Sequence, residues 1–235
     1  TYNAAFMKFS EMDYVVAKRS FDRYIKRFKS GIFLNAAHYY NAISSLNIGD
    51  TLATVLNYEK VVKTGAATFQ EKALIFLARR SYNAGDYEKS NMYYTKLLDF
   101  ISSNSIKREA IIRLMTGNEF KNKTDALNYA KQVINLDKKD NWLLSRAYII
   151  IARHEFSSGN YAKSKSTFEK VSKLSLYDEG AEAKYYLAYL TYLDEDLALA
   201  EQLIFALSED YNNDHFIAKA FILLSDIYMD QDNIF

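Results

Sequence analysis

The chain has 235 residues, of which 49% are hydrophobic and 25% charged, a composition typical of a folded protein in water. Its 30 Lys and Arg balance 29 Asp and Glu, so the net charge of +1 provides no broad field that would attract nucleic acid or an anionic membrane. Cysteine is absent, which excludes disulfides and thiolate metal sites, and proline is absent too, which argues against a sheet protein rich in tight turns.

Six segments of the chain resemble one another at a nearly constant spacing. They begin near residues 35, 71, 108, 145, 181 and 218, so successive starts are 36 or 37 residues apart. Position 8 of each segment is mostly small: Ala42, Ala78, Met115, Ala152, Ala188 and Ser225. Position 20 is small as well, and position 24 is a ring in three segments: Tyr58, Tyr94 and Phe168. Small side chains at these two positions allow two helices to pack closely, and the ring fills the space beside them.

A short turn sequence separates the two halves of most segments. Position 15 is Gly49, Gly85 or Gly159, and glycine adopts the left-handed conformation that ends a helix at little cost. The residue that follows is expected to cap the second helix by accepting backbone N–H bonds: Asp50, Asp86, Asn160 and Asp196. The third segment has Lys121-Asn122-Lys123 instead, so we expect its register to slip by one residue.

In chain order, the pattern predicts a second helix at Met12–Phe28, then a pair of helices in each segment, and a first helix before the chain stops at Phe235. The fold class is therefore all-α, with about twelve helices and no strands. Because no linker interrupts the period, we expect residues 1–235 to form a single solenoid domain. The chain begins and stops inside repeats, so we also expect it to be a fragment of a longer array.

These positions together resemble the tetratricopeptide repeat (TPR) family. The resemblance covers nearly the whole chain and implies a right-handed superhelix of stacked helix pairs whose concave groove binds a protein or peptide. The sequence departs from the family in three ways: the spacing exceeds the family's period of about 34 residues, the proline near the end of the repeat is missing, and no Trp occupies position 4.

One stretch is similar to a narrower group, the TPR proteins of the bacterial envelope. The segment "FDRYIKRFKSGIFLNAAHYYNA" resembles the Tol–Pal-associated periplasmic TPR protein and the TPR lipoprotein of the barrel-assembly machinery, where an aromatic-rich helix ends in Phe-Pro-x-Gly before Ala-x-Tyr-Tyr. Lys29 stands in place of that proline. The resemblance implies a scaffold for envelope assembly in the periplasm or cell envelope, with the cytoplasm as the alternative compartment.

A groove for the partner is expected on the first helix of each pair. Positions 2, 5, 9, 12 and 13 lie opposite the core positions, so their side chains should line the concave face. Cations beside rings at these positions suit an extended peptide that carries carboxylates or aromatic anchors. The predicted site is Lys72, Arg79, Tyr82, Arg146, Arg153, Phe156, Tyr189 and Tyr192. The alternative interpretation is that these charges are solvated or paired within the chain and that the rings pack between helices.

Other kinds of site have no support in the sequence. His38 falls on the core face, and His154 and His215 lack partners with metal-ligand spacing, so no metal site is expected. No nucleophile–base pair or phosphate loop is present, so we expect neither an enzyme nor a bound cofactor. No apolar run is long enough to insert into a membrane. The alternative to a scaffold is a structural spacer or sensory segment of a larger protein with no peptide ligand of its own.

The two terminal helices are expected to expose apolar faces. The segments "YVVAKRSFDRYIKRF" and "AFILLSDIYM" each lack a neighbouring helix in this interpretation. Terminal repeats of solenoids normally carry polar capping faces. We therefore expect the chain to self-associate end to end.

Overall fold

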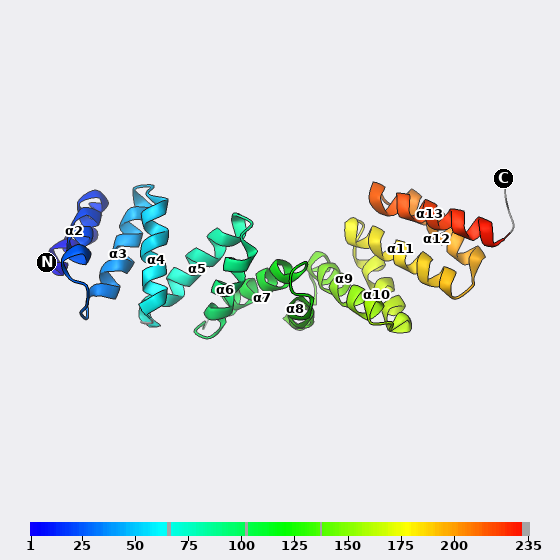
Figure 1. Ribbon diagram of the computed structural model, residues 1–235, viewed down its shortest axis with the longest axis horizontal. Coiled ribbons are helices and arrows are strands. Elements are labelled where there is room, and N and C mark those ends of the chain that lie inside the picture. Colours follow the sequence, from blue (N-terminus) through cyan, green and yellow to red (C-terminus); the bar gives the residue numbers. More distant parts are fainter. Residues whose placement is uncertain (65–66, 102, 137, 232–235) are drawn as a thin grey trace. The chain divides into compact units, whose positions relative to one another are not determined.

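The structure, a computed structural model, describes residues 1–64, 67–101, 103–136 and 138–231. Within these ranges all regular structure is α-helical and no strand occurs (Figure 1). The described helices are α1 (Tyr2–Ser10), α2 (Tyr14–Arg27), α3 (Leu34–Asn47), α4 (Thr51–Thr64), α5 (Ala67–Asn83), α6 (Tyr87–Leu98), α7 (Asn104–Asn118), α8 (Lys123–Leu136), α9 (Asn141–Ser157), α10 (Tyr161–Leu174), α11 (Asp178–Leu193), α12 (Leu197–Asp210) and α13 (Asp214–Asp230). The predicted all-α class and the helix-pair architecture of a solenoid are confirmed.

The chain divides into two compact units. The first spans Thr1–Gly117, and the second begins at Asn118. Each unit consists of helix pairs packed on their sequence neighbours, such as α3 with α4 in the first and α9 with α10 in the second. That the two units continue one another as a single solenoid stays a prediction.

Five of the turns inside the described helix pairs share one hydrogen bond, and the turn between α7 and α8 does not, since the N–H of Asn122 there donates to the carbonyl of Asn118, four residues earlier. The backbone N–H of the residue after the turn donates to the carbonyl five residues earlier: Asp13 to Lys8, Asp50 to Ser45, Asp86 to Ser81, Asn160 to Glu155 and Asp196 to Thr191. This is the six-to-one bond of the Schellman motif, which needs a left-handed residue just before the donor. Gly49, Gly85 and Gly159 supply it with φ of 80°, 74° and 74°.

The predicted caps are confirmed at three of four turns. The carboxylates of Asp50, Asp86 and Asp196 each accept from a backbone N–H three residues later. Asn160 makes no side-chain cap bond, so the prediction is wrong there. In the third segment Asn122 accepts from the N–H of Asp125, which places the cap one residue earlier and confirms the register slip.

The described residues contain one helix more than the sequence predicted, and this helix, α1, completes a pair with α2. Helix α1 packs on α2 with Ala5 fully buried between the helices, so α2 is not an unpaired second helix. Ala5 and Met12 lie 37 residues before Ala42 and Gly49, which makes them positions 8 and 15 of an earlier repeat. Met12 takes the left-handed conformation with φ 61°, so the missing glycine concealed this repeat.

Small residues pack at the closest approaches between helices. Position 8 is fully buried in Ala42, Ala78, Met115, Ala152 and Ala188. Position 20 is fully buried as well. Its serines connect the two helices of a pair: Ser90 Oγ donates to the Ala78 carbonyl at 3.2 Å, and Ser164 Oγ donates to the Ala152 carbonyl at 3.1 Å. Position 24 fills the remaining space with buried rings, including Phe21, Tyr94 and Phe168. The predicted core is confirmed at these positions, whereas Ser225, at position 8 of the last segment, is exposed.

Candidate functional site

The eight predicted site residues fall into two groups, one in each unit. Lys72, Arg79 and Tyr82 lie along α5 in the first unit. The other five lie on α9 and α11 in the second unit: Arg146, Arg153, Phe156, Tyr189 and Tyr192.

In the second unit the arginines are engaged by carboxylates of the same chain. Arg153 donates to Glu182 through Nε at 2.6 Å and Nη2 at 2.5 Å, and to Glu119 through Nη1 at 2.6 Å. Arg146 donates to Glu179 at 2.8 Å and to Glu119 at 3.0 Å. We call these five residues the Glu–Arg cluster.

The Glu–Arg cluster is buried on its acidic side. The side chains of Glu119, Glu179 and Glu182 are 6%, 9% and 8% exposed. Burial opposes the charge of Arg153, but the hydrogen bonds and charges of Glu182 and Glu119 outweigh it and raise the pKa of its guanidinium. The cluster therefore joins α9 to α11 and to the turn after α7, and it engages all three nitrogens of the Arg153 guanidinium and two of the Arg146 guanidinium.

The rings of the second unit pack against one another. The Phe156 ring lies 4.8 Å from Tyr186 and 6.0 Å from Tyr189, centroid to centroid. Tyr192 donates its hydroxyl to Asp230 of α13 at 2.7 Å. These contacts agree with the alternative interpretation of the rings, in which they pack between successive helices.

In the first unit, Arg79 is also paired. Its Nε and Nη2 donate to the two carboxylate oxygens of Glu109 at 2.7 and 2.6 Å, and the Tyr94 hydroxyl donates to the same carboxylate at 2.9 Å. These hydrogen bonds, that of Arg79 first, hold the pKa of Glu109 below its usual value against the opposing effect of burial. Unlike the Glu–Arg cluster, this pair is open to solvent, with 48% of the Arg79 side chain exposed.

Tyr82 is fixed by one contact to its hydroxyl and one to the face of its ring. Its hydroxyl shares a hydrogen bond with Thr116 at 2.8 Å, and the Arg113 guanidinium lies 4.3 Å from the ring centroid. Both partners belong to α7, so Tyr82 joins the second repeat to the third. Its ring face is occupied by an intrachain cation.

An open pocket of about 740 Å³ lies between the α3–α4 pair and α5. Lys72, Arg79 and Arg80 supply its charged residues, and Ile75, Phe76 and Tyr58 are among its apolar and aromatic lining. Lys72 and Arg80 are exposed, and within the described ranges neither pairs with a carboxylate. We call this the α5 pocket.

Tyr58 is one of the residues that line the α5 pocket. The residue is only 5% exposed, and burial raises its pKa to about 12, so its hydroxyl stays protonated. In the described part of the chain this hydroxyl has no hydrogen-bond partner. The pocket therefore offers two free cations and apolar walls, and one of its lining residues has a hydroxyl without a partner in the described residues.

Sequence reasoning missed Arg80, Phe76 and Tyr58. Tyr58 was assigned to the core through position 24, and it is buried there while it also lines the pocket. Arg80 and Phe76 stand at positions 10 and 6, just beside the positions expected to line the groove. Both residues would have been predicted if the groove had been assigned to a wider face of each first helix.

The described residues give little support to a metal site, a functional histidine or a membrane span. No group of three His, Cys, Asp or Glu in them is arranged to hold a metal ion. His38 is half-buried and its Nδ1 contacts Asn57 Oδ1 at 2.7 Å, so it is engaged within the first unit. Among the same residues, no helix is long and apolar enough to span a bilayer.

Comparison with known proteins identifies the fold of the chain but not a sequence family. No family model matches the chain, and no curated protein does either. Among solved structures, YrrB, described as a TPR protein with an unusual peptide-binding site, matches with a TM-score of 0.55 at 15% identity, covering 85% of this chain and 96% of YrrB. The C-terminal part of a TPR protein from Cytophaga hutchinsonii matches at a TM-score of 0.46 and 15% identity over 89% of this chain and 79% of that one. A TPR protein from Parabacteroides merdae matches with a TM-score of 0.42 at 17% identity, covering 97% of this chain and 84% of that one.

The likeness to YrrB shows the TPR fold. At 15% identity it shows nothing more specific, but it agrees with the helix pairs, the small residues at positions 8 and 20 and the recurring turn. The all-α solenoid architecture predicted from the sequence is therefore that of TPR proteins.

Proposed function

We propose that the chain is a non-catalytic protein–protein interaction scaffold that binds an extended peptide in the α5 pocket of its first unit. The observation that carries the proposal is the pair of unpaired cations, Lys72 and Arg80, beside apolar walls in an open pocket of about 740 Å³. TPR proteins include peptide binders, as the description of YrrB states for that protein.

The chemistry of the α5 pocket suits a peptide with an acidic residue next to an apolar one. The ammonium of Lys72 and the guanidinium of Arg80 attract a carboxylate, and Ile75 and Phe76 offer surface to an apolar side chain. The Tyr58 hydroxyl can donate to a peptide carbonyl, because protonation leaves it a donor and no described residue accepts from it. Arg79 contributes less, since Glu109 already occupies it.

Selection from a library of random peptides tests this proposal. The immobilised chain should enrich peptides that combine Asp or Glu with a nearby apolar residue, and their affinity can be measured by fluorescence anisotropy. The Lys72→Glu, Arg80→Glu double variant should weaken the selected peptides at least about tenfold, because like charges then meet. The matched control is Lys60→Glu with Lys63→Glu, which reverses two exposed lysines of α4 outside the pocket lining. Equal affinity in the two double variants would refute the assignment of the pocket.

A structural spacer is the second candidate, and one observation favours it. Arg79, Arg146 and Arg153, three of the four predicted groove cations, are paired with carboxylates of their own unit. Such pairs fix one helix pair to the next, which is what a spacer needs. Failure of the peptide selection to enrich any common sequence would favour this function.

We place the scaffold in bacterial envelope assembly, in the periplasm or cell envelope. The support is the stretch from Phe21 to Ala42 that resembles envelope TPR proteins. Fractionation of cells that produce the chain tests this location, and recovery in the cytoplasmic fraction would contradict it.

End-to-end self-association remains an expectation with a clear surface to test. Helix α13 exposes Phe221 by 45%, Ile222 by 65% and Met229 by 60%. Sedimentation at increasing concentration should show association that Ile222→Asp reduces. A monomer throughout the range would contradict it.

A further inference from the structure

The net charge of +1 conceals a separation of charge along the chain. Residues 1–117 contain 17 Lys and Arg against 10 Asp and Glu, a net charge of +7. Residues 118–235 contain 13 against 19, a net charge of −6. An excess of this size over half a chain creates a local field that the whole-chain balance does not reveal.

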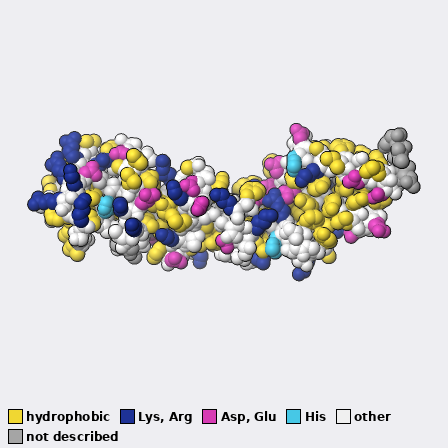
Figure 2. Space-filling model, viewed as in Figure 1, with side chains coloured by type: hydrophobic (Ala, Val, Ile, Leu, Met, Phe, Trp, Pro, Cys, Tyr) yellow, Lys and Arg dark blue, Asp and Glu magenta, His cyan; other side chains and the backbone are white. Residues whose placement is uncertain are grey.

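Much of the positive charge in the first unit lies on α2 and just after it. Residues 18–29 hold six Lys and Arg and one acid, Asp22. Lys18 pairs with Asp22 and Asp50, whereas the other five cations are exposed: Arg19, Arg23, Lys26, Arg27 and Lys29. None of these five pairs with a carboxylate in the residues that the structure describes. Figure 2 shows dark-blue side chains gathered where Figure 1 labels α2.

Four of these cations form one face of the helix. Arg19, Arg23, Lys26 and Arg27 follow one another at spacings of four, three and one residues, so they lie within about 100° of arc, opposite the buried Ala17 and Phe21. Like charges at three- and four-residue spacings repel one another and destabilise a helix. We call these four residues the basic stripe. A face that served only for solubility would gain from mixed signs, which the basic stripe lacks.

Exposed apolar side chains lie directly after the basic stripe. In the loop between α2 and α3, Phe28 is 42% exposed, Ile32 88% and Phe33 44%. The Phe28 ring lies 5.6 Å from the Arg27 guanidinium, so cations and rings adjoin.

The two phenylalanines are anchored in the unit. The Phe28 ring packs on Tyr24 with centroids 4.8 Å apart, and the Phe33 ring stacks on Tyr2 at 4.8 Å. Tyr2 and Tyr24 are themselves 5.9 Å apart, so the four rings form one connected group. This group holds the loop that presents Ile32 to solvent.

We propose that the basic stripe and the loop of residues 28–33 dock the chain on the surface of an anionic lipid bilayer. The stripe binds headgroup phosphates, and Ile32, flanked by Phe28 and Phe33, enters the boundary between headgroups and acyl chains. Clustered Lys and Arg beside exposed aromatic and aliphatic side chains are the elements of interfacial binding. Such docking needs no helix that crosses the membrane.

A lipid surface fits these residues better than a nucleic acid or an acidic protein. Nucleic acids stack bases on aromatic rings, and an exposed aliphatic side chain such as Ile32 gains nothing there. The basic stripe occupies the outer face of a helix, and none of its residues lines the α5 pocket, whereas a folded acidic segment would be expected to use a groove.

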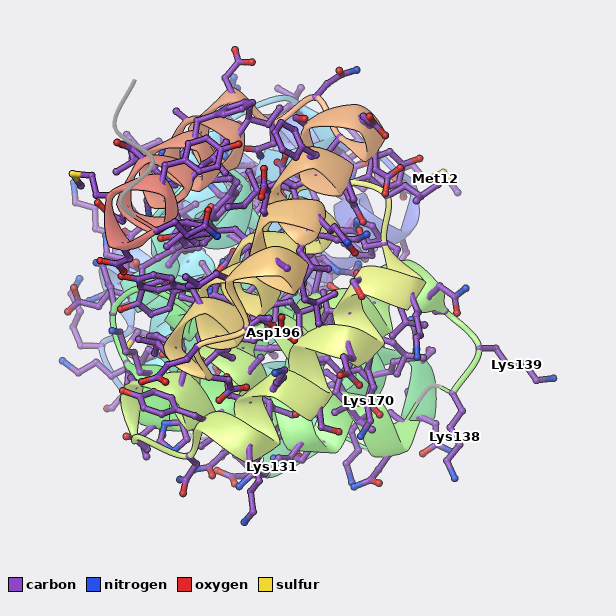
Figure 3. All side chains as sticks on the ribbon, turned by 90° about the vertical axis from the view of Figure 1, so that its right-hand side faces the viewer. Met12, Lys131, Lys138, Lys139, Lys170 and Asp196 are labelled. Atoms are coloured by element: carbon purple, nitrogen blue, oxygen red, sulfur yellow. The ribbon has the colours of Figure 1, made fainter. Side chains whose placement is uncertain are left out.

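Co-sedimentation with vesicles tests the proposal. The chain should sediment with mixed phosphatidylcholine and phosphatidylglycerol vesicles at low salt and not with phosphatidylcholine alone. Arg23→Gln with Arg27→Gln should weaken binding about 30-fold, because each cation near an anionic surface contributes separately. Ile32→Ser should weaken it several-fold. The matched control is Lys131→Gln with Lys138→Gln, two lysines that extend away from the second unit (Figure 3), and it should bind like the parent chain.

Each contrary result would overturn the proposal. Absence of binding to the anionic vesicles, or equal binding to neutral ones, would refute docking by charge. An unchanged affinity after Ile32→Ser would refute insertion of the loop. A labelled single-stranded oligonucleotide provides the remaining comparison: if it binds through Arg23 and Arg27 while vesicles do not bind, the surface is a nucleic-acid site. Circular dichroism shows whether every variant is folded.

Discussion

The two units use the same helix-pair frame but place their arginines differently. The second unit has two arginines, Arg146 and Arg153, and both lie in the Glu–Arg cluster against carboxylates that are less than one-tenth exposed. The first unit has seven, and Arg79 is paired in the open while others, such as Arg23 and Arg80, lie exposed. Arginine is therefore confined to buried contacts between repeats in the second unit, whereas the first unit also has exposed arginines, such as Arg23 and Arg80, that pair with no carboxylate in the described residues.

The largest effect should come from breaking the Glu–Arg cluster. Arg153→Met leaves the buried carboxylates of Glu119 and Glu182 without their main partner, and removing one member of a buried pair is strongly destabilising. We expect the free energy of unfolding to fall by about 3 kcal/mol, less than for a fully buried pair because the arginine is partly exposed. Urea denaturation followed by circular dichroism measures this, and a loss below about 1 kcal/mol would contradict a buried network.

The corresponding change in the first unit should cost less. Arg79→Met breaks the pair with Glu109, in which 48% of the arginine side chain and 26% of the glutamate side chain are exposed. Solvent screens such pairs, so we expect a loss of about 1 kcal/mol in the same urea experiment. A loss equal to that of Arg153→Met would remove the distinction between the two units.

Acid should weaken the first unit through Glu109. Its folded-state pKa lies below its usual value because of the hydrogen bond from Arg79 and that from Tyr94. The stabilisation is therefore fully present above the unfolded-state pKa of about 4.5 and is lost as the pH falls through the lower folded-state value. Glu109→Gln should make the melting temperature less dependent on pH below about 5. An identical pH dependence in parent and variant would contradict this.

The smallest effect should be a gain in stability at two turns, one in each unit. Met12 and Glu195 are the non-glycine residues with positive φ in the described part of the chain, at 61° and 63°. Both stand where Gly49, Gly85 and Gly159 occur in other repeats. Met12→Gly and Glu195→Gly should each raise the free energy of unfolding by about 0.5 kcal/mol, because glycine adopts this conformation without strain. Thermal melting of the single variants measures it, and a loss of stability would contradict the assigned turn.

Most of the fold was predictable because it follows from side-chain size at fixed positions. Ala78 and Ser90 show this: their spacing alone indicated a close helix–helix contact, and the structure adds a hydrogen bond between them. The first repeat was missed where glycine was replaced by Met12, since its local signal disappeared although its spacing was kept.

The site was less predictable because pairing depends on two repeats at once. Position 9 of one repeat meets position 2 of the next, as Arg79 meets Glu109 and Arg153 meets Glu182. Opposite signs at these positions, 30 and 29 residues apart, were present in the sequence and indicate the pairs once the stacking is known. Glu119 adds a third carboxylate from a turn, which no regular spacing would have predicted.

Hydrogen–deuterium exchange with a selected acidic peptide tests the central claim most directly, namely that partner binding belongs to the first unit. We expect slower exchange in α5 and in the neighbouring α3–α4 pair, which line the α5 pocket, and unchanged exchange in α9. Protection confined to α9 and α11 would contradict it, because a peptide would then bind where the arginines are already paired.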